Sequence, residues 1–124
     1  NRDKRWRNWF VGHIDPSADL SENISNLFDA LDTWFNEPTF RGCAFINAAG
    51  ELGDTKPKAF KISKVHKEYI YDDVLKLCSK AKVKNPEKLA SKINLLIEGA
   101  IVRAYLNSDK EAAILAKEMA KLLL

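Results

Sequence analysis

The 124-residue chain has few helix-breaking residues and no apolar run long enough to cross a membrane. It contains 5 glycines and 4 prolines. The longest uncharged run, residues 42–50, is far shorter than a transmembrane helix requires. No signal-peptide pattern is present at its start, and turn-bounded alternating runs typical of strands are missing. These absences favour one all-α domain in the cytoplasm with no membrane partner.

The motifs of common catalytic and cofactor sites are also missing. The sequence has no glycine-rich phosphate loop, no Cys/His metal spacing, no serine elbow and no internal repeat. Asp29 and Asp32 form a carboxylate pair with no ligand or nucleophile near them in sequence. His66 lies inside an apolar stripe, where a hydrogen-bonded core histidine and a ligand contact both fit. We expect neither an enzyme nor a metal or cofactor.

Cysteine and charge are both limited. Cys43 and Cys78 lie among apolar residues, which favours buried free thiols in a reducing cytosol over a disulfide or metal pair. The net charge of +3 is too small to indicate that this segment binds nucleic acid. The single basic cluster fits a solvated helix face, with a phosphate-binding patch as the alternative. It consists of Arg2, Lys4, Arg5 and Arg7.

Apolar residues at helical spacing predict about six helices that form a bundle. Asp19 or Ser21 is expected to cap the second helix, and Asn85 with Pro86 to open the fifth. The Ser108-x-x-Glu111 spacing predicts a capping box for the last helix. The expected ranges are 2–14, 20–35, 40–52, 58–82, 86–106 and 108–124.

Aromatic residues are concentrated on the first predicted helix. Trp6, Trp9, Phe10 and His13 fall on one side of it. Core packing and the wall of an apolar ligand pocket would both use such residues. Asn47 is the polar residue inside the nearly all-apolar segment 40–52, and its amide is expected to hold backbone or to face a ligand.

The last two predicted helices have more apolar surface than one buried face needs. The fifth also contains Gly99 at mid-helix, where we expect another helix to approach closely. On the sixth, Ala112, Ala116 and Ala120 form a small-residue ridge. This surplus predicts a dimeric four-helix bundle with two helices from each chain. Central helices in a larger monomeric bundle are the alternative.

Two stretches resemble a known family. The segment Phe40-Arg-Gly-Cys-Ala-Phe-Ile-Asn-Ala-Ala-Gly-Glu51 resembles the central motif of the effector-binding domain of TetR-type bacterial transcriptional regulators. The segment Leu95–Ile101 followed by the alanine-rich end is similar to that family's last helices. Weaker similarities lie at Leu27–Phe35 and around His66.

The resemblance implies a regulatory domain that binds a small, mostly apolar or aromatic effector and forms a homodimer. In that family, effector binding releases operator DNA, which is read by an N-terminal helix-turn-helix domain. No such pattern precedes Asp15, so DNA binding would need a domain missing from this chain. A structural dimerisation domain without a ligand is the alternative.

The helix faces on which these residues fall then predict the residues of the effector pocket and of the dimer interface. The effector pocket would be lined by Trp9, Phe28, Leu31, Phe35, Cys43, Phe45, Asn47, His66, Tyr69 and Ile70. The dimer interface would use Ile93, Ile97, Ile101, Ala112, Ala116 and Leu123.

Overall fold

The computed structural model describes the backbone of residues 2–38, 40 and 57–124, and the side chains of 4–38, 40 and 67–124. These ranges contain five α-helices and no strand, which confirms the predicted all-α class for this part of the chain. The helix predicted over 40–52 lies outside them, apart from Phe40. The helices are α1 (Arg2–Val11), α2 (Leu20–Phe35), α4 (Pro57–Lys80), α5 (Pro86–Asn107) and α6 (Ala112–Leu122).

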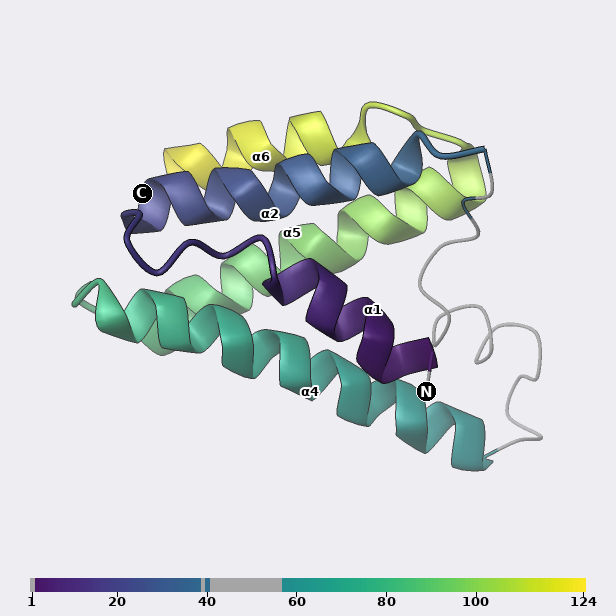
Figure 1. Ribbon diagram of the computed structural model, residues 1–124, viewed down its shortest axis with the longest axis horizontal. Helices are drawn as coiled ribbons and strands as arrows, with labels where there is room; N and C mark the ends of the chain where they lie inside the picture. Colours follow the sequence, from purple (N-terminus) through teal and green to yellow (C-terminus); the bar gives the residue numbers. More distant parts are fainter. Residues whose placement is uncertain (1, 39, 41–56) are drawn as a thin grey trace.

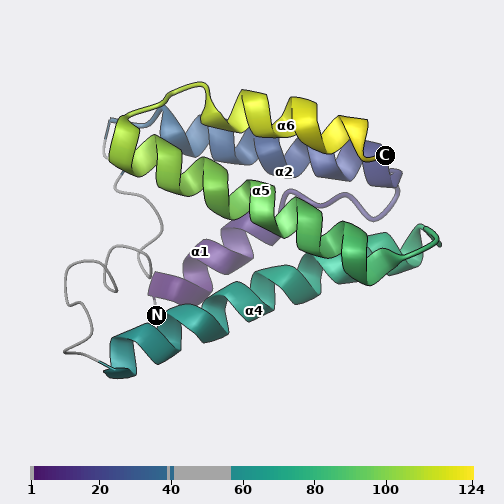
Figure 2. The same cartoon turned by 180° about the vertical axis from the view of Figure 1, so that it is seen from behind.

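The helices are arranged in two tiers joined by α5. α2 and α6 run side by side along one edge of the molecule, and α4 runs along the opposite edge (Figure 1). α5 crosses between them and packs against both α4 and α6, as the view from behind shows (Figure 2). α1 lies between α2 and α4. None of the described helices covers the outer side of α5 and α6.

Most helix ends follow the predicted capping residues. The Asp19 carboxylate accepts a hydrogen bond from the Glu22 backbone N–H at 2.8 Å and begins α2. The Asn85 side chain accepts one from the Lys88 N–H at 3.2 Å and begins α5. α1 ends at Val11, three residues earlier than predicted, because the next turn tightens to bonds between residues three apart.

The predicted capping box at Ser108 is wrong. Ser108 is instead the residue that ends α5, with a left-handed backbone at φ 53°. α6 begins at Ala112, and Glu111 before it makes no capping bond with its side chain. Asp109 occupies the turn, where its carboxylate pairs with Arg103 at 3.0 Å. The Ser108 backbone N–H donates to the Arg103 carbonyl, as a left-handed residue at the end of a helix commonly does. Ser108 therefore ends α5 and does not begin α6.

The core is formed by the inward stripes of α2, α5 and α6 together with buried side chains of α1 and α4. Its largest side chains are at most 1% exposed. Each such side chain contributes about 1.5–3 kcal/mol to folding through burial. The α6 positions that face inward are alanines, which allow neighbouring helices to approach closely. The largest fully buried side chains are Phe10, Phe28, Phe35, Ile24, Leu27, Leu31, Ile93, Ile97, Val74 and Cys78.

Among the described residues of the single chain, Gly99 makes no close contact with another helix. Among the described residues, no atom lies within 4 Å of the position that a Cβ would occupy there. The residue is exposed on the outer side of α5. Within this part of the chain, its cost to helix stability is therefore not offset by packing.

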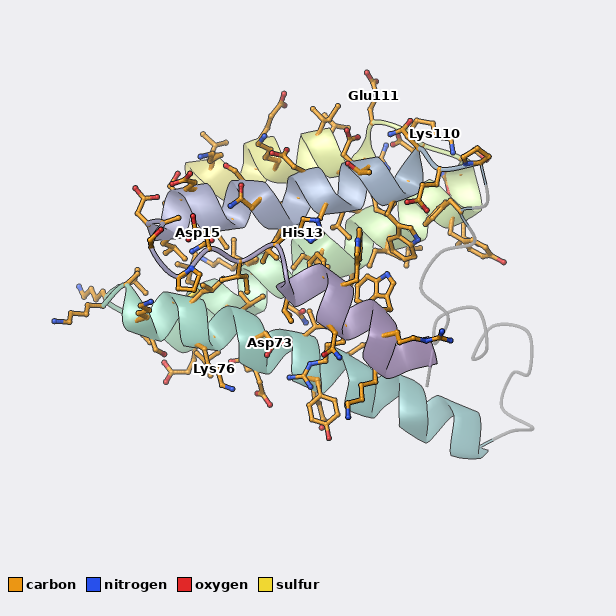
Figure 3. All side chains as sticks on the ribbon, in the orientation of Figure 1. His13, Asp15, Asp73, Lys76, Lys110 and Glu111 are labelled. Atoms are coloured by element: carbon orange, nitrogen blue, oxygen red, sulfur yellow. The ribbon has the colours of Figure 1, made fainter. Side chains whose placement is uncertain are left out.

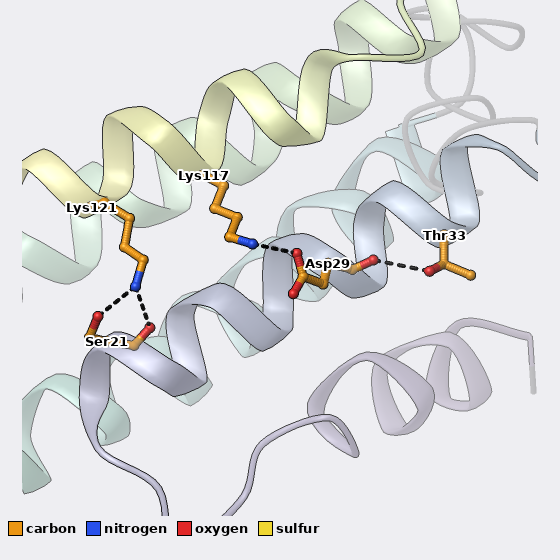
Figure 4. A network of polar contacts seen from close by, with 5 residues as sticks. All are labelled: Ser21, Asp29, Thr33, Lys117 and Lys121. Atoms are coloured by element: carbon orange, nitrogen blue, oxygen red, sulfur yellow. Dashed lines mark hydrogen bonds and ion pairs between the residues drawn. The ribbon is translucent and has the colours of Figure 1, made fainter.

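A polar flank of α6 is used to hold α2 (Figure 4). Lys117 Nζ pairs with Asp29 Oδ1 at 2.8 Å, and Lys121 Nζ donates to Ser21 Oγ at 2.6 Å. Thr33 Oγ1 donates to the Asp29 carbonyl at 3.1 Å. Because the pairs are exposed, each contributes at most about 1 kcal/mol. They fix which side of α6 faces α2.

Cys78 is a free thiol that is fully buried, as predicted for this cysteine. Burial in apolar surroundings raises the pKa of the Cys78 thiol, because the thiolate would lose its hydration. Cys43 lies outside the described residues. Cys78 is therefore a core residue with suppressed reactivity.

Asn23 on α2 anchors the connection between α1 and α2. Its side chain is 3% exposed. Its Oδ1 accepts from the Asp15 N–H at 2.8 Å, and its Nδ2 donates to the carbonyls of Asp15 at 3.0 Å and Ala18 at 3.4 Å. One buried amide thus satisfies three backbone groups of the loop.

We predict that Asn23→Ala destabilises the protein by about 1–3 kcal/mol, because it leaves buried backbone groups without partners. Asn26→Ala is the matched control, since Asn26 is half-buried on the same helix and its side chain makes no hydrogen bond with the described residues. Urea denaturation followed by circular dichroism measures both. Equal midpoints for the two variants would contradict the anchoring role.

Candidate functional site

Six aromatic rings form a cluster at one end of α1 and α2. We define the aromatic cluster as Trp6, Trp9, Phe10, Trp34, Phe35 and Phe40. The three tryptophans approach one another, with ring centroids 5.2 Å apart for Trp6–Trp34, 6.2 Å for Trp6–Trp9 and 6.4 Å for Trp9–Trp34. Trp6 also stacks on Phe10 at 5.1 Å, and Phe40 meets Trp34 edge-on at 4.9 Å. Helical spacing puts the α1 rings on one face, and packing brings Trp34 against them.

Polar groups border the cluster on two sides. Lys110 Nζ donates to the Phe35 carbonyl at 2.7 Å and lies 5.9 Å from the centre of the Phe40 ring. His13 Nδ1 lies 2.9 Å from the Trp9 carbonyl, which can only accept, so Nδ1 is the donor. Figure 3 labels both side chains, with His13 at the end of α1 and Lys110 before α6. Trp9 is 36% exposed and opens the cluster to solvent.

An arginine fixes α1 on α4. Arg7 Nε and Nη2 each lie 3.0 Å from one oxygen of Asp73, which is a bidentate pair. The Arg7 guanidinium also lies 4.5 Å above the Tyr69 ring. The hydrogen bond with Asp73 raises the pKa of Arg7. Because guanidinium and carboxylate forks match in geometry, this pair sets the position of α1 along α4.

The predicted effector residues are divided between core and surface. Trp9 and Phe35 belong to the aromatic cluster. Phe28, Leu31 and Ile70 lie in the core with at most 5% exposure. Tyr69 is 47% exposed and faces Arg7. The side chains of Cys43, Phe45, Asn47 and His66 lie outside the described residues.

Several cluster members were not among the predicted effector residues. Trp6 and Phe10 share the i, i+3 and i+4 face with Trp9, so the sequence contained the signal for them. Trp34 and Phe40 come from separate segments, and only the packing of α2 against α1 brings them to the same place.

Five of the six predicted dimer residues are buried within the single chain. Ile93, Ile97 and Ile101 are at most 3% exposed, and Ala112 and Ala116 at most 7%. These side chains already pack against the chain's own helices, so they have almost no surface left for a partner. The assignment needs correction for Ile93, Ile97 and Ile101, whereas Ala112 and Ala116 line the groove between α5 and α6. Leu123, at 39% exposure, remains accessible.

A second apolar stripe follows the outer side of α5 and α6. All large exposed apolar side chains of the described part, except Trp9 and Tyr69, lie on these helices or directly after α6. Three of them, Leu95, Leu115 and Met119, line an open groove of about 610 Å³ between α5 and α6. The stripe keeps spacings of four and three residues on both helices. We define this outer strip as Leu95, Gly99, Val102, Leu106, Leu115, Met119 and Leu122.

Chemistry beyond apolar contact is limited in the described residues. No group of three His, Cys, Asp or Glu side chains gathers there in a way that could hold a metal. Among the helices searched in that part, none has the length and apolar character to span a membrane. Searches with protein-family models, curated proteins and solved structures found no match to the chain.

We predict that Arg7→Ala loosens α1 from α4 and lowers the free energy of unfolding by on the order of 1 kcal/mol. The intrinsic tryptophan emission should shift to longer wavelength, because Trp6 and Trp9 move with α1. Arg5→Ala, on the same helix and exposed, is the control and should leave the emission unchanged. Identical spectra for both variants would show that the ion pair does not position α1.

Proposed function

We propose that the chain is the effector-binding and dimerisation domain of a TetR-type transcriptional regulator. The proposal is supported by the resemblance of residues 40–51 and 95–101 to that family, and by the all-α arrangement of the described helices. The observation that carries it is the outer strip on α5 and α6. The proposed partners are a second copy of the chain and a small hydrophobic or aromatic effector.

The outer strip has the pattern of half a four-helix bundle. On α5 it lies opposite the buried stripe that contains Ile93 and Ile97, so this helix is apolar on two faces. Leu95 and Leu106 are each 69% exposed, and Met119 is 55% exposed. An apolar surface of this extent is costly in water and is typical of an interface. Spacings of four and three residues are those of helices that pack at small angles.

A second copy of the chain is the partner that fits this surface. Two neighbouring helices with the same spacing can pair with themselves about a two-fold axis. The open space at Gly99 would accept a partner side chain, since no described atom lies within 4 Å of its Cβ position. Two ion pairs flank the strip, Lys67–Glu98 at 3.9 Å and Arg103–Asp109 at 3.0 Å. An apolar centre with a charged rim is the usual composition of protein interfaces.

The effector would bind beside the aromatic cluster, among α1, α2 and α4. Trp9 offers an exposed ring there, and flat apolar molecules stack on such rings. α1 is held on α4 by the Arg7–Asp73 pair, so a molecule that enters this region would compete with the present position of α1. In a full-length regulator, α1 would lead to the DNA-reading domain. A shift of α1 would then change the spacing of the two domains and release operator DNA.

One observation favours the alternative of a dimerisation domain without a ligand. Phe28, Leu31 and Phe35, three of the predicted effector residues, are at most 1% exposed. Their surfaces are already covered by the chain itself. The two functions differ in whether an added ligand raises the melting temperature.

We predict that Leu115→Glu converts a dimer to a monomer, because it places a charge in the middle of the outer strip. Sedimentation equilibrium at tens of micromolar measures the mass. Ile114→Glu is a closely matched control: both side chains are 46% exposed, but only Leu115 lines the α5–α6 groove. A monomeric wild-type chain, or equal effects of the two variants, would rule out this interface.

We also predict that a small aromatic compound such as naphthalene or indole raises the melting temperature. A ligand at 100 times its Kd stabilises the folded state by about 2.7 kcal/mol, which corresponds to roughly 10 °C for a domain of this size. Trp9→Ala should remove the shift, whereas Tyr105→Ala on α5 should not. If no compound of a broad aromatic panel changes the melting temperature, the ligand-free alternative is correct.

A further inference from the structure

A lysine-rimmed groove runs round the end of the molecule where α4 turns into α5. It consists of two hollows of about 590 and 520 Å³, which share Asp19, Leu20 and Ala81 in their linings. Both volumes lie within the range of small-molecule sites. We call the continuous hollow the end groove. It lies away from the aromatic cluster and from the groove between α5 and α6.

The floor of the end groove is apolar and comes from several separate parts of the chain. The α1–α2 connection contributes Ile14 and Pro16, α4 contributes Leu77, and the α4–α5 turn contributes Val83. The last described residues close one side. Other apolar residues of the lining are Leu20, Leu89, Leu123 and Leu124. An apolar channel of this kind fits an alkyl chain.

The rim of the end groove is strongly basic. Lys76, Lys84, Lys88 and Lys92 line it, and none of their ammonium groups makes an ion pair or hydrogen bond with the described part of the chain. Lys80 also lines it and donates to the Pro16 carbonyl at 3.1 Å. Figure 3 labels Lys76 on α4. Several such cations around one hollow make it favourable for an anion.

Asp19 and Asp73, the carboxylates that line the groove, form no ion pair with these lysines. Asp19 is used to cap α2, where it accepts from the Glu22 N–H at 2.8 Å. Asp73 is held by both nitrogens of the Arg7 fork. Lys88 moreover lies in the first turn of α5, where the helix dipole disfavours a positive charge. An anion placed there would be stabilised by the lysines, since the first turn of α5 already contains Glu87 and the Asn85 side chain already caps the Lys88 N–H.

From this juxtaposition of an apolar channel and a basic rim, we propose that the end groove binds a long-chain carboxylate, with the alkyl chain on the floor and the carboxylate between Lys84 and Lys88. A concave hollow of a few hundred Å³ matches one alkyl chain better than a flat membrane surface. The inference does not depend on the proposed regulator function, because it uses neither the aromatic cluster nor the outer strip.

Isothermal titration calorimetry with dodecanoate, below its micellar concentration, tests the proposal on the whole chain. We expect saturable one-to-one binding, weaker binding of dodecanol, and none of acetate. Lys84→Glu should weaken the affinity about tenfold, as expected for the loss of a charge-assisted contact. Arg5→Glu makes the same change of charge at an exposed position of α1 and should leave the affinity unchanged.

Two further measurements distinguish binding in the end groove from binding elsewhere on the molecule. Binding that survives Trp9→Ala but not Lys84→Glu assigns dodecanoate to the end groove rather than to the aromatic cluster. Equal affinities of the Lys84→Glu and Arg5→Glu variants would overturn the proposal. So would association seen only as co-sedimentation with vesicles of anionic phospholipid, without binding of the free carboxylate.

Discussion

The arrangement of the described helices depends on the alanine face of α6. Ala112, Ala113, Ala116 and Ala120 are at most 7% exposed, and their short side chains allow α6 to lie close to α2 and α5. With this face buried, one flank of α6 contacts α2 and the other is exposed to solvent. Lys117 and Lys121 contact α2, whereas the flank that contains Leu115 is exposed to solvent. The position of the outer strip is therefore a consequence of small residues that make no specific contact of their own.

α1 is held by a different combination of forces. It is a short helix, and a helix of this length is marginal in water without tertiary contacts. Its aromatic face packs on α2, and the Arg7–Asp73 pair connects it to α4. The apolar contacts supply most of the stabilisation, and the ion pair selects one position along α4. A helix held in this way can be displaced by a molecule that competes for the aromatic surface.

Charge is distributed unevenly over the molecule in a way that the net value of +3 does not reveal. Lys117 and Lys121 have partners along the α2–α6 contact, where their polar contacts fix the orientation of α6. Lys76, Lys84, Lys88 and Lys92, which have no partner among the described residues, surround the end groove beside an apolar floor. The same residue type therefore orients a helix at one place and remains solvent-exposed at another.

Because capping and helical periodicity are local properties, the sequence predicted the helical class, the aspartate and asparagine caps of α2 and α5, and the limits of most described helices. It also placed Trp6, Trp9 and Phe10 on one face. It did not determine which of two apolar stripes on α5 is internal: Ile93 and Ile97 were expected at an interface, but they lie in the core, and Leu95 and Val102 face outward. Likewise, Ser108 looked like the start of a helix and instead ends one. These points depend on the tertiary structure, because an apolar helix face is buried or exposed according to which distant helices cover it.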